Sequence, residues 1–206
     1  MSDGLKFPQP MRPSGFGGRI FGYLMEWFAA PNYRWVMAQL EPAAPRYYLE
    51  IGFGTGRLAQ LVANRFAPVL LCGVDHSELM CATAMRRLHR FEAQSKLHLR
   101  LGDDTLLANW PDRAFDAIVA SHSFQFWSDP ATTFSRLRAR LTPTGRLILV
   151  VRRHISKDVM GWIPNPITKS ADELGGLRSA LSAAGFRIVR DEKLKTGSHG
   201  IVAVCA

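Results

Sequence analysis

The sequence predicts an α/β fold in which a doubly wound, mostly parallel sheet ends in an antiparallel hairpin. Short apolar runs at residues 46–51, 69–74, 97–101, 115–120 and 146–151 alternate with longer segments of helical period. Such alternation is typical of parallel strands joined by right-handed helical crossovers. The final runs, FRIVRDEKL and HGIVAVCA, lie only a few residues apart. These two strands must be antiparallel, because a parallel crossover needs about a dozen residues.

The length and composition predict one folded domain behind a short arm. The chain has 206 residues, of which 47% are hydrophobic, enough for a sizeable core. Residues 1–18 are rich in proline and glycine and are expected to form a flexible or surface-lying arm. Residues 19–206 are expected to form the single domain. Its first part, residues 19–44, is predicted to be a cap of two short helices that Pro31 separates.

The charge and cysteine content narrow the class of protein. A formal charge of +9 suits a nucleic-acid or anionic-membrane partner, but the arginines are scattered and favour an ordinary solvated surface. Three cysteines without CxxC spacing predict neither a disulfide framework nor a metal site, and they fit a cytoplasmic protein. No apolar run reaches the roughly 18 residues of a membrane span, and the N-terminus lacks a signal-peptide core. We therefore expect a soluble protein.

The segment YLEIGFGTGR, residues 48–57, predicts a ligand-binding loop between a strand and a helix. Such a loop brings backbone N–H groups and a helix N-terminus to the carboxyl edge of the sheet, where nucleotide-like ligands bind. The dinucleotide pattern G-x-G-x-x-G fails because Arg57 occupies the position of its last glycine, and no phosphate-binding Gly-Lys-Ser/Thr follows. Glu50, two residues before Gly52, would repel a pyrophosphate and attract a cationic amino group or sulfonium. The loop therefore favours an amino-acid nucleoside.

Five successive motifs resemble those of the class I S-adenosylmethionine-dependent methyltransferases, and more narrowly the type 11 group. They lie in LEIGFGTGRLAQLV, GVDHSELM, LRLGDDTLLANWPDRAFDAIVASHSFQFWSDP and LTPTGRLILVVRR, the third segment holding two motifs. The resemblance runs from about residue 46 to the C-terminus. It implies a Rossmann-like sheet of seven strands and S-adenosylmethionine as cofactor.

The resemblance also assigns cofactor-binding roles by position. It places the three glycines against the methionine and ribose of the cofactor. It places one acid near the methionine amino group, one at the ribose hydroxyls and two near the adenine. The histidine is expected against the adenine, and the serine near the methionine amino group. In chain order these residues are Glu50, Gly52, Gly54, Gly56, Asp75, His76, Asp103, Asp104 and Ser121. Asp75 also lies about 20 residues past the loop, the spacing of a ribose-binding acid. Asp103 can equally be a helix cap, and Asp104 a solvated side chain.

Methyl transfer requires a positioned acceptor, and a base only where that acceptor carries a proton. His122, after the fourth strand, is the candidate general base, and its alternative is a structural histidine. The candidate acceptor-pocket residues lie in the N-terminal helices, after the fourth strand and in a predicted lid over residues 154–170. They are Tyr33, Gln125, Trp127, His154 and Trp162, with Trp27 and Trp35 nearby. Trp127 and the other aromatic residues can instead pack in the core.

These features favour an enzyme that methylates a small or lipid-like molecule. RNA methylation is the alternative that the positive charge suggests. Against it, the segment ASHSFQFW lacks the Asp/Asn-Pro-Pro-Tyr/Phe signature of enzymes that methylate base amino groups. A non-catalytic protein that binds S-adenosylmethionine is the third possibility, since an intact binding loop does not require turnover.

Overall fold

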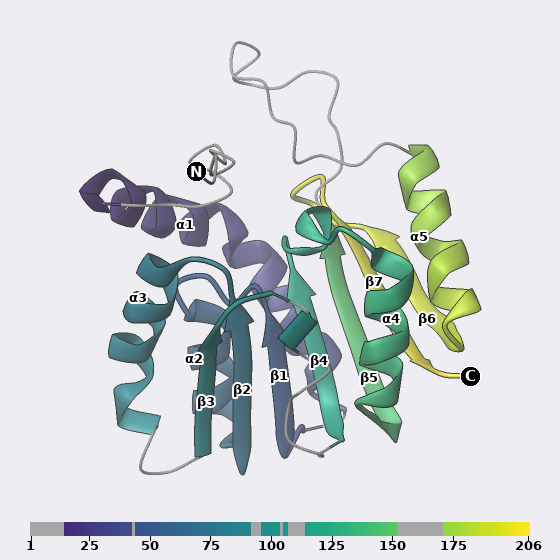
Figure 1. Ribbon diagram of the computed structural model, residues 1–206, viewed down its shortest axis with the longest axis horizontal. Coiled ribbons are helices and arrows are strands. Elements are labelled where there is room, and N and C mark those ends of the chain that lie inside the picture. Colours follow the sequence, from purple (N-terminus) through teal and green to yellow (C-terminus); the bar gives the residue numbers. More distant parts are fainter. Residues whose placement is uncertain (1–14, 43, 92–95, 104, 107–113, 152–170) are drawn as a thin grey trace, which may run out of the picture.

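The fold is a seven-stranded sheet with helices packed against both of its faces (Figure 1). The computed structural model describes residues 15–42, 44–91, 96–103, 105–106, 114–151 and 171–206. The strand order is β3-β2-β1-β4-β5-β7-β6. The first five strands are parallel, and β7 pairs antiparallel with both β5 and β6. This confirms the predicted parallel sheet with an antiparallel C-terminal hairpin.

The strands form where the sequence has its apolar runs. Their bounds are β1 Tyr47–Ile51, β2 Leu70–Asp75, β3 Lys96–Leu101, β4 Phe115–Ser121, β5 Leu141–Val151, β6 Phe186–Lys193 and β7 His199–Cys205. Strands β2 and β4 are almost wholly buried, as expected of central strands covered on both faces.

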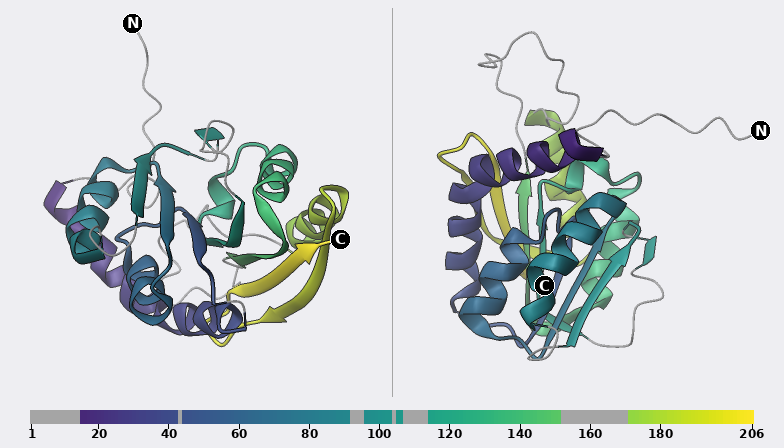
Figure 2. Two further views of the ribbon diagram at one scale, coloured as in Figure 1. Left: turned by 90° about the horizontal axis from the view of Figure 1, so that it is seen from below. Right: turned by 90° about the vertical axis from the view of Figure 1, so that its left-hand side faces the viewer.

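The helices connect these strands and cover the two faces. They are α1 Gly15–Leu40, α2 Arg57–Phe66, α3 Glu78–Leu88, α4 Pro130–Ala139 and α5 Ala171–Ala183, with short 3-10 turns η1 His89–Phe91 and η3 Phe124–Phe126. Helices α1, α2 and α3 lie on one side of the sheet, and α4 and α5 on the other (Figure 2). None of the helices in the described part of the chain is long and apolar enough to span a membrane.

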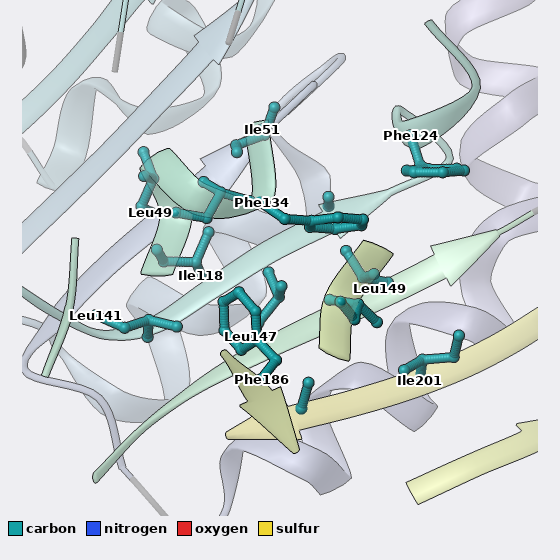
Figure 3. Close-up of a cluster of buried hydrophobic side chains, with 14 of the residues drawn as sticks. Leu49, Ile51, Ile118, Phe124, Phe134, Leu141, Leu147, Leu149, Phe186 and Ile201 are labelled. Atoms are coloured by element: carbon teal, nitrogen blue, oxygen red, sulfur yellow. The ribbon is translucent and has the colours of Figure 1, made fainter. Parts of the chain in front are cut away.

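Alternating side chains of the strands divide the core into two layers. Leu49 and Ile51 of β1 face the layer under α4 and α5, together with Phe134 of α4 (Figure 3). Tyr48 of β1 faces the opposite layer, where Val36 packs from α1. The central strands are therefore held from both sides, which fixes the positions of the loops at their carboxyl ends.

Helix α1 corrects the prediction of two short N-terminal helices. It is one continuous helix of 26 residues that contains Pro31, and Figure 2 shows that it changes direction along its length. A proline within a helix removes one backbone hydrogen bond and bends the helix, but its fixed φ is compatible with helical geometry. The helix also begins at Gly15, inside the segment predicted as an arm. Residues 1–14 lie outside the described part of the chain.

Candidate functional site

The candidate site lies at the carboxyl edge of the sheet, where the glycine loop follows β1. Gly52, Gly54 and Gly56 have φ angles of 72°, 54° and 76°, a region that side chains disfavour. A Cβ at Gly52 would collide with Ser123, and one at Gly56 would lie 2.8 Å from the Cβ of Ala84. At Gly54 such a Cβ would meet no described atom within 4 Å. Packing thus explains why Gly52 and Gly56 are glycines, whereas Gly54 presents its bare backbone to open space.

Asp75, the last residue of β2, fastens the glycine loop to the neighbouring strand. Its Oδ2 accepts a hydrogen bond of 2.8 Å from the Gly54 N–H, and its Oδ1 accepts one of 2.9 Å from the Ser77 N–H. The side chain is only 6% exposed, and burial raises the pKa of the carboxyl. Each carboxylate oxygen can accept a further hydrogen bond. The predicted ribose-binding acid therefore lies directly beside the open glycine.

Glu50 is buried on β1 and contacts the start of helix α2. Its carboxylate accepts hydrogen bonds from the Tyr48 hydroxyl, at 3.1 Å, and from the backbone N–H of Ala59. Ala59 lies in the first turn of α2, whose N-cap Gly56 has no side chain to offer. Burial, aided by the negative charge of Asp75, raises the pKa of Glu50 to about 8. The acid thus caps the helix that follows its own strand, a role that its position before the glycines did not suggest.

Two of the residues predicted at the adenine lie at the ends of β2 and β3. His76 is half exposed, and its ring centroid lies 5.7 Å from that of Phe126. Asp103 accepts hydrogen bonds from the backbone N–H and the hydroxyl of Thr105, and these bonds lower its pKa. Asp103 therefore has the local capping contacts considered as its alternative. Asp104 lies outside the described residues.

The end of β4 brings Ser121 and His122 to the same edge. Ser121 is buried, and its hydroxyl has no hydrogen-bond partner among the residues that the structure describes. His122 has a φ of 59°, and its backbone N–H donates to Val150 of β5. Its ring Nε2 lies 2.9 Å from Nδ2 of Asn32 in helix α1. Sequence reasoning missed Asn32, which is 90 residues away along the chain.

Helix α1 is held over the glycine loop by one arginine. Arg87 of α3 donates to Oε1 of Glu26 at 2.7 Å and to both the carbonyl and the hydroxyl of Thr55 at 3.0 Å. Both partners of the ion pair are largely buried, with 15% exposed side chains. Tyr33 lies further along α1, where burial and the negative charge of Glu50 raise the pKa of its hydroxyl. The α1 helix thus covers the side of the site formed by the loop.

The structure separates the aromatic candidates for an acceptor pocket. Trp127 is buried in the core against Phe124 and Phe134, so it is a packing residue rather than part of a pocket. Trp35 packs on β7, since a Cβ at Gly200 would lie 2.7 Å from its ring. Trp27 is 72% exposed.

The side chains of three other acceptor candidates lie outside the described part of the structure. The Gln125 side chain is outside the described part of the structure, as are His154, Trp162 and the whole predicted lid of residues 154–170. Of the two candidates whose side chains are described, Tyr33 and Trp127, Tyr33 is the one whose hydroxyl has its pKa raised by burial and by the charge of Glu50.

Comparison with known proteins gives a consistent match for the parallel part of the sheet. Residues 49–147 match a family described as a methyltransferase domain. Trans-aconitate 2-methyltransferase from Acidovorax sp. (strain JS42) is 34% identical over 114 residues, which are 54% of this chain and 40% of that enzyme. The chain therefore spans less than half the length of the curated relatives it matches.

Solved structures match over a larger part of the chain. Magnesium protoporphyrin IX methyltransferase from Synechocystis PCC 6803, with SAH bound, superposes with a TM-score of 0.63 over 94% of this chain and 89% of that chain. At 20% sequence identity, this structural likeness shows a common fold. The 4+2 cyclase SpnF is 29% identical, with a TM-score of 0.58 over 73% of this chain and 55% of the cyclase.

Proposed function

Because residues 49–147 match a methyltransferase-domain family, we propose that the chain is a class I S-adenosylmethionine-dependent methyltransferase and transfers a methyl group from S-adenosylmethionine to a small-molecule acceptor. One observation carries the proposal most directly. The Gly54 backbone, open to space, lies hydrogen-bonded to the buried carboxylate of Asp75. A ligand with a hydroxylated ribose can approach that backbone and donate to that carboxylate.

The residues of the site fit this cofactor chemically. Asp75 has unused lone pairs at the carboxyl end of β2, suited to the ribose hydroxyls. Glu50 places a second buried acid beneath the loop, and a cationic ligand would favour its ionised form. His76 and Phe126 offer ring surface for the adenine. The buried carboxylates therefore gain from a cationic nucleoside and would lose from a phosphate.

The protein's contribution to the reaction is to position the acceptor and to exclude water from the site. The bound cofactor would supply an activated methyl group for an in-line displacement. Arg87 and Glu26 hold α1 over the loop, which restricts solvent access to the cofactor side. Tyr33, Ser121 and His122 lie on the elements that border the acceptor side. The reaction then depends mainly on the orientation of the acceptor.

A small molecule is the favoured acceptor. The trans-aconitate and magnesium protoporphyrin enzymes are named for small-molecule substrates, and they match this chain over its central motifs or its fold. The three cysteines are free, which fits a reducing compartment such as the cytoplasm.

The similarity to SpnF favours a second candidate function. That relative is named as a cyclase and is 29% identical to this chain. In this second candidate function the chain binds S-adenosylmethionine at the same site and converts a small molecule without consuming the methyl group. The two candidates share the cofactor site and differ only in whether S-adenosylhomocysteine accumulates.

Calorimetric titration with S-adenosylmethionine tests the shared part of both candidates. We expect binding, and Asp75→Ala should weaken it by about 1–3 kcal/mol because hydrogen bonds to the ribose are lost. Asp116→Ala is the matched control, since Asp116 also accepts two backbone hydrogen bonds, from Arg46 and Tyr47, but lies at the other end of the sheet. Equal losses in the two variants, or no binding at high micromolar cofactor, would refute the proposed site.

Product analysis then separates the candidates. The wild-type protein is incubated with S-adenosylmethionine and a panel of small carboxylic acids and phenols. Formation of S-adenosylhomocysteine in amounts matching a methylated product supports methyl transfer. Conversion of a panel member with no S-adenosylhomocysteine supports the cyclase-like alternative.

A further inference from the structure

Asn32 joins three segments that surround the candidate site. The residue lies next to Pro31 in helix α1 and is 2% exposed. Its Nδ2 lies 2.9 Å from Nε2 of His122 and 3.3 Å from the hydroxyl of Ser198, and its Oδ1 lies 2.6 Å from the hydroxyl of Thr196. Helix α1, the end of β4 and the turn between β6 and β7 therefore meet at one buried amide.

The distances fix which way this amide points. A separation of 2.6 Å is typical of an O–H···O hydrogen bond, whereas N–H···O bonds are centred near 2.9–3.0 Å. The Asn32 oxygen therefore faces Thr196 and accepts from its hydroxyl. The amide nitrogen must then face His122 and Ser198, where it donates a hydrogen to each.

This orientation determines the tautomer of His122. An amide N–H₂ cannot accept a hydrogen bond, so the ring Nε2 that it contacts must offer a lone pair. A neutral imidazole with a lone pair on Nε2 carries its hydrogen on Nδ1. The backbone of the same residue is fixed by the bond from its N–H to Val150 and by its φ of 59°. Ring and backbone are thus held together.

We propose that Asn32 is a positioning residue that fixes His122 in the Nδ1–H tautomer, so that the Nε2 lone pair is held by the amide and is closed to general-base catalysis. The tautomer follows from the contacts alone, whereas its consequence for catalysis rests on the proposed methyl transfer. The acceptor atom then arrives without a proton, as a carboxylate does, or loses its proton to another group. This reverses the role expected of His122 from its position.

Nitrogen NMR of the ¹⁵N-labelled wild-type protein tests the tautomer without any ligand. Long-range ¹H–¹⁵N correlation distinguishes a protonated ring nitrogen from one with a lone pair, and His122→Asn identifies the His122 signals by their loss. We expect the lone-pair signal at Nε2 and the protonated signal at Nδ1. The opposite pattern would overturn the proposal. Since neither cofactor nor acceptor is present, the result is independent of whether methyl transfer is found.

Asn32→Asp tests whether Asn32 sets the tautomer. A carboxylate at this position accepts hydrogen bonds only, so the Nε2 signal should move from the lone-pair range to the protonated range. Gln39→Glu is the matched control, because Gln39 is a buried amide on the same helix whose Nε2 donates to the Trp35 carbonyl. Its His122 signals should match those of the wild type. An unchanged Nε2 signal in Asn32→Asp, or an equal change in Gln39→Glu, would contradict the assignment.

Discussion

Glu50 shows how one residue can serve both the fold and the site. Its carboxylate receives the hydroxyl of Tyr48 and the N–H of Ala59 at the start of α2, in a position that is 2% exposed. Burial of an acid with only neutral donors favours the protonated form, which is why the pKa rises to about 8. The same acid would become ionised beside a cationic ligand. The folded protein without ligand therefore carries a cost that grows with pH.

Replacing Glu50 with glutamine should remove that pH dependence. The folded state keeps the Glu50 proton up to about pH 8, whereas the unfolded chain releases it near the ordinary pKa of 4.5. The wild type therefore binds more protons when folded, and this group lowers stability as pH rises between these values. We expect the free energy of unfolding of Glu50→Gln, relative to wild type, to increase by on the order of 3 kcal/mol from pH 5 to pH 8.

Denaturant unfolding at several pH values measures this difference. Glu41→Gln is a suitable control, since Glu41 is an exposed acid paired with Arg65. The expected difference should appear in the Glu50 variant alone. A gap between Glu50→Gln and wild type that stays constant from pH 5 to pH 8 would show that Glu50 is ionised in the folded protein.

At the scale of elements, helix α1 depends on long-range contacts for its place over the loop. Arg87 of α3 is the central residue, because its guanidinium reaches Glu26 of α1 and both oxygens of Thr55. All three oxygens lie within hydrogen-bond distance of the same guanidinium nitrogen, Nη1, which joins them at one point. The cofactor-side wall is therefore assembled by one side chain that links helix to helix and helix to loop.

Arg87→Ala should loosen this wall. The Glu26 carboxylate, 15% exposed, would lose its charged partner, and we expect a loss of about 1–3 kcal/mol in the free energy of unfolding. Cofactor affinity should fall as well, since the loop and α1 are no longer joined. Arg86→Ala, the exposed neighbour on the same helix, is the control for removing a positive charge. Similar losses in both variants, measured by thermal unfolding and calorimetry, would exclude the linking role.

The elements also show what could be predicted from the sequence. The buried central strands were predictable because each is a short apolar run, and the hairpin because its connection is too short for a crossover. The open backbone of Gly54 followed from the glycine spacing. The continuous α1 was not predictable, since tertiary contacts kept a helix through Pro31. Asn32 was missed because its partner Ser198 is 166 residues away and no local pattern marks it.

At the scale of the whole molecule, the positive charge and the candidate site are separate features. The formal charge is +9, yet several arginines are already paired with acids. The described ion pairs join Arg65 to Glu41, Arg87 to Glu26, Arg178 to Asp191 and Arg190 to Glu192. The net charge already subtracts these acids, but each pair places an acid beside an arginine, so these arginines do not form a purely basic patch. The residues at the cofactor side, by contrast, include the buried acids Glu50 and Asp75.

We therefore expect RNA to bind this protein only weakly and through general electrostatics. Fluorescence anisotropy with a labelled single-stranded RNA should show binding at low salt that weakens steeply as salt increases, because phosphate contacts release counterions. At physiological salt the dissociation constant should lie in the non-specific range of about 10⁻⁴–10⁻⁶ M. Heparin should compete as well as unlabelled RNA, since charge alone is recognised. Submicromolar binding at physiological salt that heparin fails to displace, together with RNA methylation, would instead make RNA the acceptor and overturn the small-molecule proposal.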